Sequence, residues 1–326
     1  MARLLVARVG QAIVIIGIVA TLTFVLLHLA PGDPTSRLAE APRVPPAVRE
    51  QLRRNFGLDK PLPVQYLRYV ANVARGRFGY SHAEHRPAAA TIAARIPQTL
   101  LLAAVALVLA FGTGIVVGVY QGTVAGSPSD RALSLATLAV YATPVFWLAL
   151  MLQLVLAETL GWFPVSGAID PVSYPYLSPL AKLWDRAIHV PLPALALGLV
   201  GAAAVARYQR AAMFSAMVAE FVRAARAKGL AERTVIVRHA LRNALLSAIT
   251  LFGLAFPSLV SGAVLVETVF GWPGMGRLAV SSIAARDYDV VTGIAIVGAA
   301  MVVTGNLLAD LLYRAIDPRT RTAAAR

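Results

Sequence analysis

The 326-residue sequence contains no cysteine and little charge: 14% of its residues are Asp, Glu, Lys or Arg, whereas 58% are hydrophobic. The absence of cysteine excludes disulfides, thiolate metal sites and cysteine nucleophiles. A soluble domain usually carries about 25% charged residues. The low charge and the mean hydropathy of +0.68 therefore exclude a disordered chain and argue against an ordinary soluble enzyme.

The few charges are unevenly balanced, because 30 Lys and Arg residues stand against 16 Asp and Glu residues and give a formal charge of +14. A basic excess in so apolar a chain is typical of a membrane protein whose basic residues gather in particular loops. Nucleic-acid binding also uses a basic surface, but it needs that surface on a soluble fold. We therefore expect membrane lipid, and no nucleic acid, among the partners of this chain.

Motifs for the common chemistries are also missing. The sequence has no G-x-x-x-x-G-K-[ST] phosphate loop, no H-E-x-x-H zinc motif and no G-x-S-x-G nucleophile elbow. It therefore predicts a chain that is not an enzyme and that holds no catalytic residue, metal or cofactor of its own.

Long apolar runs are the main feature that is present. A helix that crosses a bilayer needs about 20 mostly apolar residues. Five runs meet this requirement, and a weaker sixth ends where Arg207 and Arg210 begin a charged stretch. The six predicted spans are Val9–Ala30, Thr99–Tyr120, Leu133–Ala157, Val190–Ala206, Ser247–Val266 and Val290–Tyr313. The first is too long for the apolar region of a signal peptide, so it is expected to remain as an anchor.

Basic residues between the spans predict the orientation of the chain. If the N-terminus is inside, the cytoplasmic pieces are 1–8, 121–132, 207–246 and 314–326, which together contain 15 of the 30 Lys and Arg residues. The short external loops 158–189 and 267–289 contain only four. Loops rich in Lys and Arg stay on the cytoplasmic side. Both termini of a multi-pass protein are therefore predicted to be cytoplasmic.

Segment 31–98 follows the first span and is too long to be a simple connector. Its 11 basic and five acidic residues do not decide the topology, because loop charge loses its influence beyond about 60 residues. The sequence therefore predicts three parts: the N-terminus with the first span (1–30), an external segment (31–98) and a core of five spans (99–326).

Glycine and proline punctuate several predicted spans. Gly114-x-x-x-Gly118 would allow another helix to approach the second span closely. Pro144 in the third span and Pro257 in the fifth each remove a backbone hydrogen bond and can bend a helix around a pathway. Both residue types are also commoner in membrane helices than in soluble ones, so a role in gating does not follow from their presence.

The predicted cytoplasmic loop 207–246 contains eight basic and two acidic residues. The pattern from Ala216 to Lys228 predicts an amphipathic helix with Phe221 and Ala225 on one face. Gly229 stands where helices often end in a left-handed residue, and a second helix is expected to continue from there into the fifth span. This arrangement suits docking into a groove on another protein. A basic helix lying on anionic lipid is an equal alternative on the residues alone.

Several strings in the chain resemble a known family. The segment Glu220–Leu230, followed by Arg238–Ala244, resembles the cytoplasmic signature loop of binding-protein-dependent ABC importer permeases. It is similar in particular to the first permease subunit of dipeptide, oligopeptide and nickel importers. The general family pattern is Glu-Ala-Ala-x-x-x-Gly, and Arg223 stands in this chain at the position of its leading glutamate, as is typical of the peptide-type members. Further strings match in family order, at Leu27–Pro34, Phe56–Asp59, Gly161–Gly167, Glu267–Gly276 and Arg286–Tyr288.

The resemblance implies an all-α membrane protein with six transmembrane helices, a cytoplasmic coupling helix and a long external segment after the first span. It implies four kinds of partner: a second homologous permease, two cytoplasmic ATPase subunits that bind ATP and Mg, an extracytoplasmic substrate-binding protein, and the substrate itself. Contact with the ATPase subunits is expected at Glu220, Phe221, Arg223, Ala224, Ala225, Lys228, Gly229 and Leu230.

The function implied is uptake of di- and oligopeptides across a bacterial or archaeal cytoplasmic membrane. Import of nickel, opines or glutathione is the alternative within the family, and a secondary transporter is the alternative outside it. A secondary transporter should work without ATPase partners and often shows inverted repeats or broken spans. A membrane enzyme should carry a catalytic pair or metal set within its spans. The sequence displays neither pattern.

Overall fold

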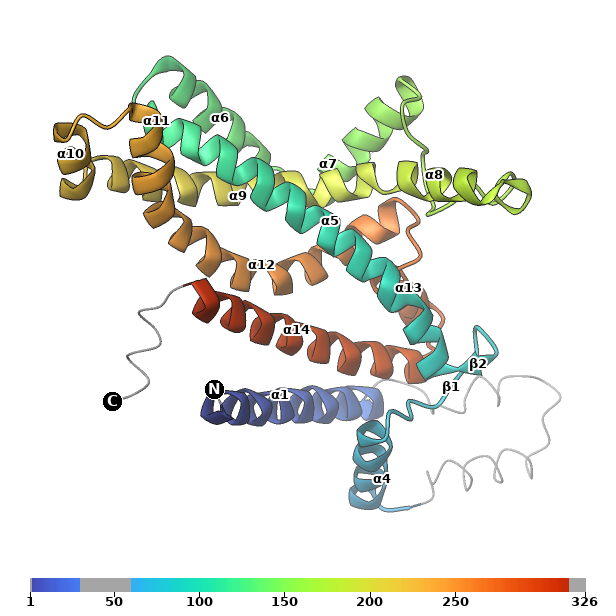
Figure 1. Ribbon diagram of the computed structural model, residues 1–326. Coiled ribbons are helices and arrows are strands. Elements are labelled where there is room, and N and C mark those ends of the chain that lie inside the picture. The colour runs from blue at the N-terminus through green and yellow to red at the C-terminus, as the bar shows by residue number, and fades with distance from the viewer. Residues whose placement is uncertain (1, 30–59, 317–326) are drawn as a thin grey trace. The chain divides into compact units, whose positions relative to one another are not determined.

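The computed structural model describes residues 2–29 and 60–316, and it consists almost entirely of helices (Figure 1). The chain divides into two compact units. One contains residues 1–95 and 278–303, and the other contains residues 96–277 and 304–326. Residues 30–59, which include the predicted external string Phe56–Asp59 and the first half of the external segment, lie outside the described part.

The first unit contains α1 (Ala2–Leu29), α4 (Leu62–Ala74), a short hairpin of β1 (Tyr80–Ser81) and β2 (Arg86–Pro87), and the parts of three further helices that fall within residues 88–95 and 278–303. Aromatic contacts hold α4 against α1. The ring of Phe24 lies 5.3 Å from that of Tyr66 and 5.4 Å from that of Tyr69, and the hydroxyls of Thr21 and Tyr66 are 2.7 Å apart. Part of the predicted external segment is therefore anchored to the first span by α4.

Two aspartates fix the hairpin of this unit to the start of α14 (Tyr288–Ile316). Ser81 Oγ donates to Asp287 Oδ2 at 2.7 Å, and the backbone N–H of Tyr80 donates to Asp289 Oδ2 at 2.8 Å. The strands pair antiparallel, with Ser81 opposite Arg86. Asp287 belongs to the string Arg286–Tyr288, so the structure gives this string a role in holding the hairpin.

The second unit contains most of the buried core, and residues 304–316 at the end of α14 also belong to it. Its elements are α5 (Ala88–Thr123, from residue 96), α6 (Pro128–Ala142), α7 (Val145–Leu152), the π-helix η1 (Gln153–Thr159), the 3₁₀ turn η2 (Tyr174–Tyr176), α8 (Pro179–His189), α9 (Pro191–Met217), α10 (Glu220–Ala227), α11 (Glu232–Thr234), the π-helix η3 (Val235–Ala240), α12 (Leu241–Val269) and the start of α13 (Met275–Ala284). One cluster of its core is formed by buried side chains of α5, α7, η1, α9 and α12 and of the loop after α12.

Helices α5 and α9 pack with their backbones in close approach. A Cβ atom placed on Gly114 would stand 2.7 Å from the carbonyl oxygen of Ala202, and one on Gly118 would stand 2.5 Å from that of Ala206. Gly122 continues the row, since its Cβ would lie 2.5 Å from Cβ of Met213. The close approach predicted for Gly114-x-x-x-Gly118 is confirmed, and the contact extends one turn further.

The third predicted span, Leu133–Ala157, is not one continuous helix. Helices α6 and α7 meet at Thr143 and Pro144 with a bend of 103°. Pro144 lacks the N–H that would continue α6, so the break agrees with the bend expected at this proline. The side chain of Pro257, the other predicted bending residue, lies outside the described residues.

By length and composition, four helices or helix pairs of the described residues are sufficient to cross a membrane, or five if the bent pair α6–α7 counts as one span. The four are Arg8–Leu26, Ala88–Thr123, Pro179–Met217 and Tyr288–Leu308. The predicted span Ser247–Val266 falls within α12, a helix with several side chains outside the described part. The prediction of an all-α membrane fold is confirmed, whereas the count of six spans stays a prediction.

The string Glu267–Gly276 folds around a buried carboxylate. Glu267 is fully buried and accepts hydrogen bonds from Thr99 Oγ1 at 2.7 Å and from the backbone N–H groups of Gly276 at 2.7 Å and Arg277 at 3.0 Å. A Cβ on Gly274 would lie 2.2 Å from Oε1 of Glu267, so any side chain there would displace the carboxylate from these hydrogen bonds. The conformation of this string is therefore fixed by the carboxylate at its first residue.

Candidate functional site

All eight residues predicted to contact an ATPase lie on one short helix, α10, and on the turn that follows it. Helix α9 ends at Met217, and the chain turns at Val218 and Ala219 before α10 begins. Ala219 has an extended backbone with ψ 153°, which starts the new helix, and Glu220 in the first turn suits the positive end of the helix dipole. The prediction of one continuous helix from Ala216 to Lys228 is therefore wrong.

The buried face of α10 is formed by Val222 and Ala225, which are 0% and 5% exposed. These side chains pack in a hydrophobic cluster with residues from the end of α9, from η3 and from the start of α12; its other buried members are Met213, Ala216, Val235, Ala240 and Ala244. Phe221 is 40% exposed. Ala225 therefore faces the core together with Val222, whereas Phe221, predicted on the same face as Ala225, lies at the exposed edge of that face.

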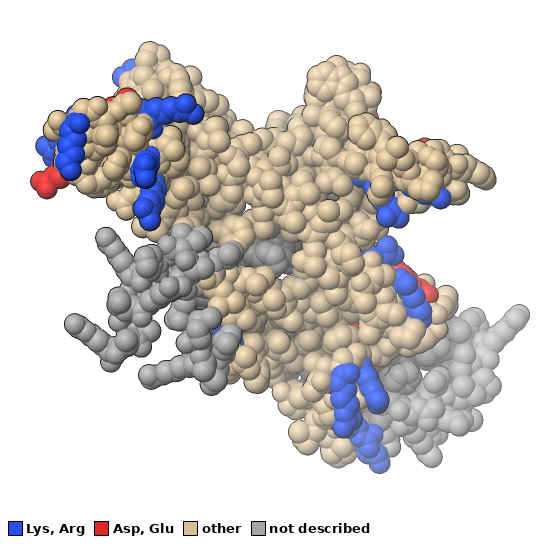
Figure 2. Space-filling model, viewed as in Figure 1, with Lys and Arg blue, Asp and Glu red and all other residues tan. Residues whose placement is uncertain are grey.

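The other predicted site residues form an exposed surface, which we call the α10 surface. It consists of Glu220, Phe221, Arg223, Ala224, Lys228, Gly229 and Leu230. Figure 2 shows Lys and Arg side chains gathered over the end of the second unit that carries α10 and α11, with few acidic side chains among them. The α10 surface therefore combines an exposed aromatic ring with a basic surround.

The turn after α10 is closed by backbone hydrogen bonds typical of a helix that ends in glycine. Gly229 has φ +76°, its N–H donates to the carbonyl of Arg226 at 2.9 Å, and the N–H of Leu230 donates to that of Ala225 at 3.4 Å. These two bonds form a Schellman motif, which requires a left-handed residue at this position. The helix end predicted at Gly229 is confirmed.

A charged pair spans the same turn. Arg226 donates to Glu232 through Nη2 at 2.7 Å and through Nε at 3.1 Å. Hydrogen bonding to Arg226 lowers the pKa of the Glu232 carboxyl, and hydrogen bonding to Glu232 raises the pKa of the Arg226 guanidinium. Beyond Glu232, α11, η3 and α12 follow one another without a gap, so the second helix expected after Gly229 is confirmed, whereas the fifth span within it stays a prediction.

A second charged pair lies in the same unit and was not predicted. Arg210 of α9 donates to both carboxylate oxygens of Asp130, at 2.6 and 2.7 Å, and Asp130 is 1% exposed. At the start of α6, the N–H of Gly126 donates to the carboxylate of Asp130, and the N–H of Asp130 donates to Ser127 Oγ. The sequence Ser127-Pro128-Ser129-Asp130 is a recognisable helix start, but its partner 80 residues later carries no local signal.

The described residues contain no group of three or more His, Cys, Asp and Glu side chains placed to hold a metal ion. The α10 surface exposes the ring of Phe221, the charged groups of Arg223 and Lys228, and the small residue Ala224. The helix that carries them is packed into the core on its opposite face. Of the exposed groups, the aromatic ring and the arginine belong to residue types that are enriched at protein interfaces.

The described part of the chain has several helices that are long and apolar enough to cross a bilayer, as a multi-pass membrane protein requires. Residues 114–322 match the family described as binding-protein-dependent transport system inner membrane component, and residues 1–103 match the N-terminal model of such membrane components. The chain belongs to this family, which confirms the resemblance of its signature strings. It is therefore a membrane component of a transport system.

Similar proteins cover nearly the whole chain. The oligopeptide transport system permease protein AppB of Bacillus subtilis is 39% identical over 320 residues, covering 98% of this chain and 99% of AppB. The di/tripeptide permease DppB of Pseudomonas aeruginosa is 38% identical over 315 residues, covering 93% and 94%. The dipeptide permease DppB of Escherichia coli is 36% identical over 336 residues, covering 98% and 99%. All three relatives are named for peptide transport.

Proposed function

We propose that this chain is one permease subunit of an ATP-driven importer that carries di- and oligopeptides across the cytoplasmic membrane into the cell. The names of its full-length relatives support the peptide substrate. Its family supports a binding protein that delivers the substrate from outside. A second, homologous permease completes the pathway, two ATPase subunits bind ATP and Mg, and both termini face the cytoplasm.

The observation that carries the proposal is the α10 surface. Phe221, Arg223 and Ala224 are exposed on a helix whose opposite face is fixed in the core by Val222 and Ala225. A groove in an ATPase subunit could take the Phe221 ring, while Arg223 and Lys228 meet acidic groups at its rim and Ala224 allows a close approach. Aromatic residues and arginine are enriched at the centre of such interfaces.

The packing of α10 against its neighbouring helices explains how an ATP-driven movement would reach the membrane. Because Val222 and Ala225 pack against the end of α9, η3 and the start of α12, a displacement of α10 pushes on the helices before and after it. Interfaces packed in this way move as rigid bodies between discrete arrangements. Closure of the ATPase pair would thereby switch the pathway between its outward and inward openings.

The test uses two variants on the α10 surface, Phe221→Ala and Arg223→Glu, in the assembled transporter. We expect each to reduce the ATPase subunits that co-purify with this chain and to abolish ATP-dependent uptake of a labelled dipeptide, while the amount of inserted chain is unchanged. Arg131→Glu is the matched control, because Arg131 is an exposed basic residue of α6 outside the α10 surface. Full ATPase association and full uptake in both variants would refute the docking assignment.

A further inference from the structure

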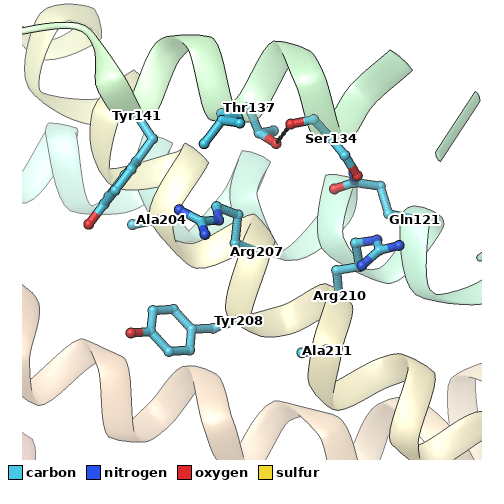
Figure 3. Close-up of a pocket in the computed structure, with 10 residues that line it drawn as sticks. Gln121, Ser134, Thr137, Tyr141, Ala204, Arg207, Tyr208, Arg210 and Ala211 are labelled. Atoms are coloured by element: carbon cyan, nitrogen blue, oxygen red, sulfur yellow. Dashed lines mark hydrogen bonds between the residues drawn. The ribbon is translucent and has the colours of Figure 1, made fainter. Parts of the chain in front are cut away.

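The second unit contains a cavity of about 640 Å³ between the end of α5, helix α6 and helix α9 (Figure 3). Arg207, Tyr208 and Arg210 enter it from α9, and Ser134, Thr137 and Tyr141 enter it from α6. Gln121 lines its wall from the last turn of α5. No step of the proposed transport mechanism uses these side chains.

The cavity carries one positive charge that is not balanced by a carboxylate. The guanidinium of Arg210 is occupied by Asp130, with which it forms two hydrogen bonds. Arg207 lies over the ring of Tyr141, 5.2 Å from the ring centre, and forms no ion pair among the described residues. A ring face attracts a cation without neutralising it, so the cavity favours an anion.

The wall of the cavity also contains an unpaired hydrogen-bonding group. Gln121 is 1% exposed, and its Nε2 donates to Ser134 Oγ at 3.0 Å and to the carbonyl oxygen of Asp130 at 3.5 Å, whereas its Oε1 has no partner. Turning the amide over would pair its oxygen with Ser134 and leave the nitrogen unpaired instead. One end of a buried amide therefore lacks a protein partner in either orientation, and a hydroxyl group, which both donates and accepts, could pair with it in each case.

The position of the cavity indicates where such a ligand comes from. Arg207 and Arg210 directly follow the apolar run that ends at Ala206, which places them at headgroup level if this run spans the membrane. Tyr141 and Tyr208 are 49% and 61% exposed, as is usual for tyrosines at a membrane interface. Basic pockets between helices on the cytoplasmic side are known to suit anionic headgroups.

We propose that this cavity binds the headgroup of an anionic glycerophospholipid, with its phosphate at Arg207 and its glycerol hydroxyls toward Gln121. Phosphatidylglycerol supplies both groups. The assignment to the inner leaflet rests on the orientation given under the proposed function. A lipid bound there would fill the space between α6 and α9 close to the pair Asp130–Arg210.

The experiment uses the assembled transporter, purified through a tag on this chain and exchanged into phosphatidylcholine nanodiscs. Phosphatidylglycerol is then titrated in, and the bound lipid is counted by native mass spectrometry. We expect Arg207→Gln to weaken phosphatidylglycerol binding about tenfold, as removal of one charged hydrogen-bond donor does. Arg207→Lys should retain part of the affinity, and the control Arg131→Gln should retain all of it.

Equal phosphatidylglycerol binding by the wild type and Arg207→Gln would overturn the proposal, as would equal binding of phosphatidylcholine and phosphatidylglycerol. Displacement of the lipid by a dipeptide, in a manner that depends on Arg207, would overturn it in favour of a substrate site. The lipid measurement needs no transport. If the wild-type transporter binds phosphatidylglycerol through Arg207 but takes up no peptide, this result would count against the proposed function and not against the lipid site.

Discussion

Gly118 of α5 faces the carbonyl oxygen of Ala206 in α9 so closely that a Cβ atom on the glycine would lie 2.5 Å from that oxygen. Real Cβ atoms do not approach a backbone oxygen to this distance, so the two helices must separate if any side chain is added. The pair Gly118–Ala206 therefore sets how close α5 and α9 can lie.

The first prediction concerns this contact. Gly118→Ala should destabilise the chain by about 1–3 kcal/mol, because one methyl group forces two packed backbones apart. Gly112→Ala is the control on the same helix, since a Cβ there would meet no atom within 4 Å. The control should be neutral or slightly stabilising. Thermal unfolding of the two purified variants compares their melting temperatures. Equal values for Gly118→Ala and Gly112→Ala would contradict the close contact.

The second prediction separates backbone strain from crowding at Gly229. Its φ of +76° is unfavourable for residues with a branched Cβ, although no atom lies within 4 Å of a Cβ placed there. Gly229→Val should cost about 1–2 kcal/mol through the backbone alone. Gly229→Asn should cost less, because asparagine tolerates the left-handed region. Hydrogen exchange of amides 228–231 measures the stability of the turn in both variants. An equal loss of protection in the two would show that the left-handed backbone of residue 229 is not the cause of the destabilisation.

The third prediction is a pH dependence at the pair Arg226–Glu232. Hydrogen bonding to Arg226 lowers the pKa of Glu232 in the folded chain. A carboxyl with a lowered pKa stabilises the fold above its unfolded pKa of about 4.3, and this contribution is lost as the pH falls through the folded pKa. Wild type and Glu232→Gln should therefore differ in protection of the turn at pH 7 and become alike in strong acid. A difference that grows on acidification would have the wrong sign.

The fourth prediction concerns Glu267. Replacement by glutamine keeps one acceptor oxygen but turns an N–H₂ group toward donors, either Thr99 or the N–H groups of Gly276 and Arg277. Glu267→Gln should thus destabilise the chain by about 1–3 kcal/mol. Thr99→Ser, which keeps the hydroxyl and loses only a buried methyl group, should cost less, about 1 kcal/mol or below. Calorimetry or thermal unfolding compares them, and an unaffected Glu267→Gln variant would mean that the carboxylate does not organise this string.

Features encoded over a few residues could be predicted from the sequence. The turn at Gly229 and the close approach at Gly118 each depend on one residue whose backbone or size leaves little choice, and Pro144 marks a place where a helix can break. The family strings supplied the identity of α10 as a candidate docking helix. These signals are local, so no tertiary information was needed to detect them.

Features that depend on the path of the chain were missed. The turn at Val218–Ala219 restarts the helix with a new rotation, so Val222 rather than Phe221 faces the core. The pair Asp130–Arg210 joins two helices 80 residues apart, and charge patterns along one helix do not contain it. Such contacts are decided by packing, which residue periodicity does not determine.

The two-residue turn at Val218–Ala219 joins α10 almost directly to α9, whose 27 residues extend about 40 Å. This length exceeds the hydrocarbon thickness of a bilayer, about 30 Å. A tilt of a few degrees at the α10 end would therefore become a displacement of several ångströms at the other end of α9. Since close contacts at glycines hold α5 against α9, the two helices would tilt together. A movement of α10 on one side of the membrane would then be transmitted to the other side by this helix pair.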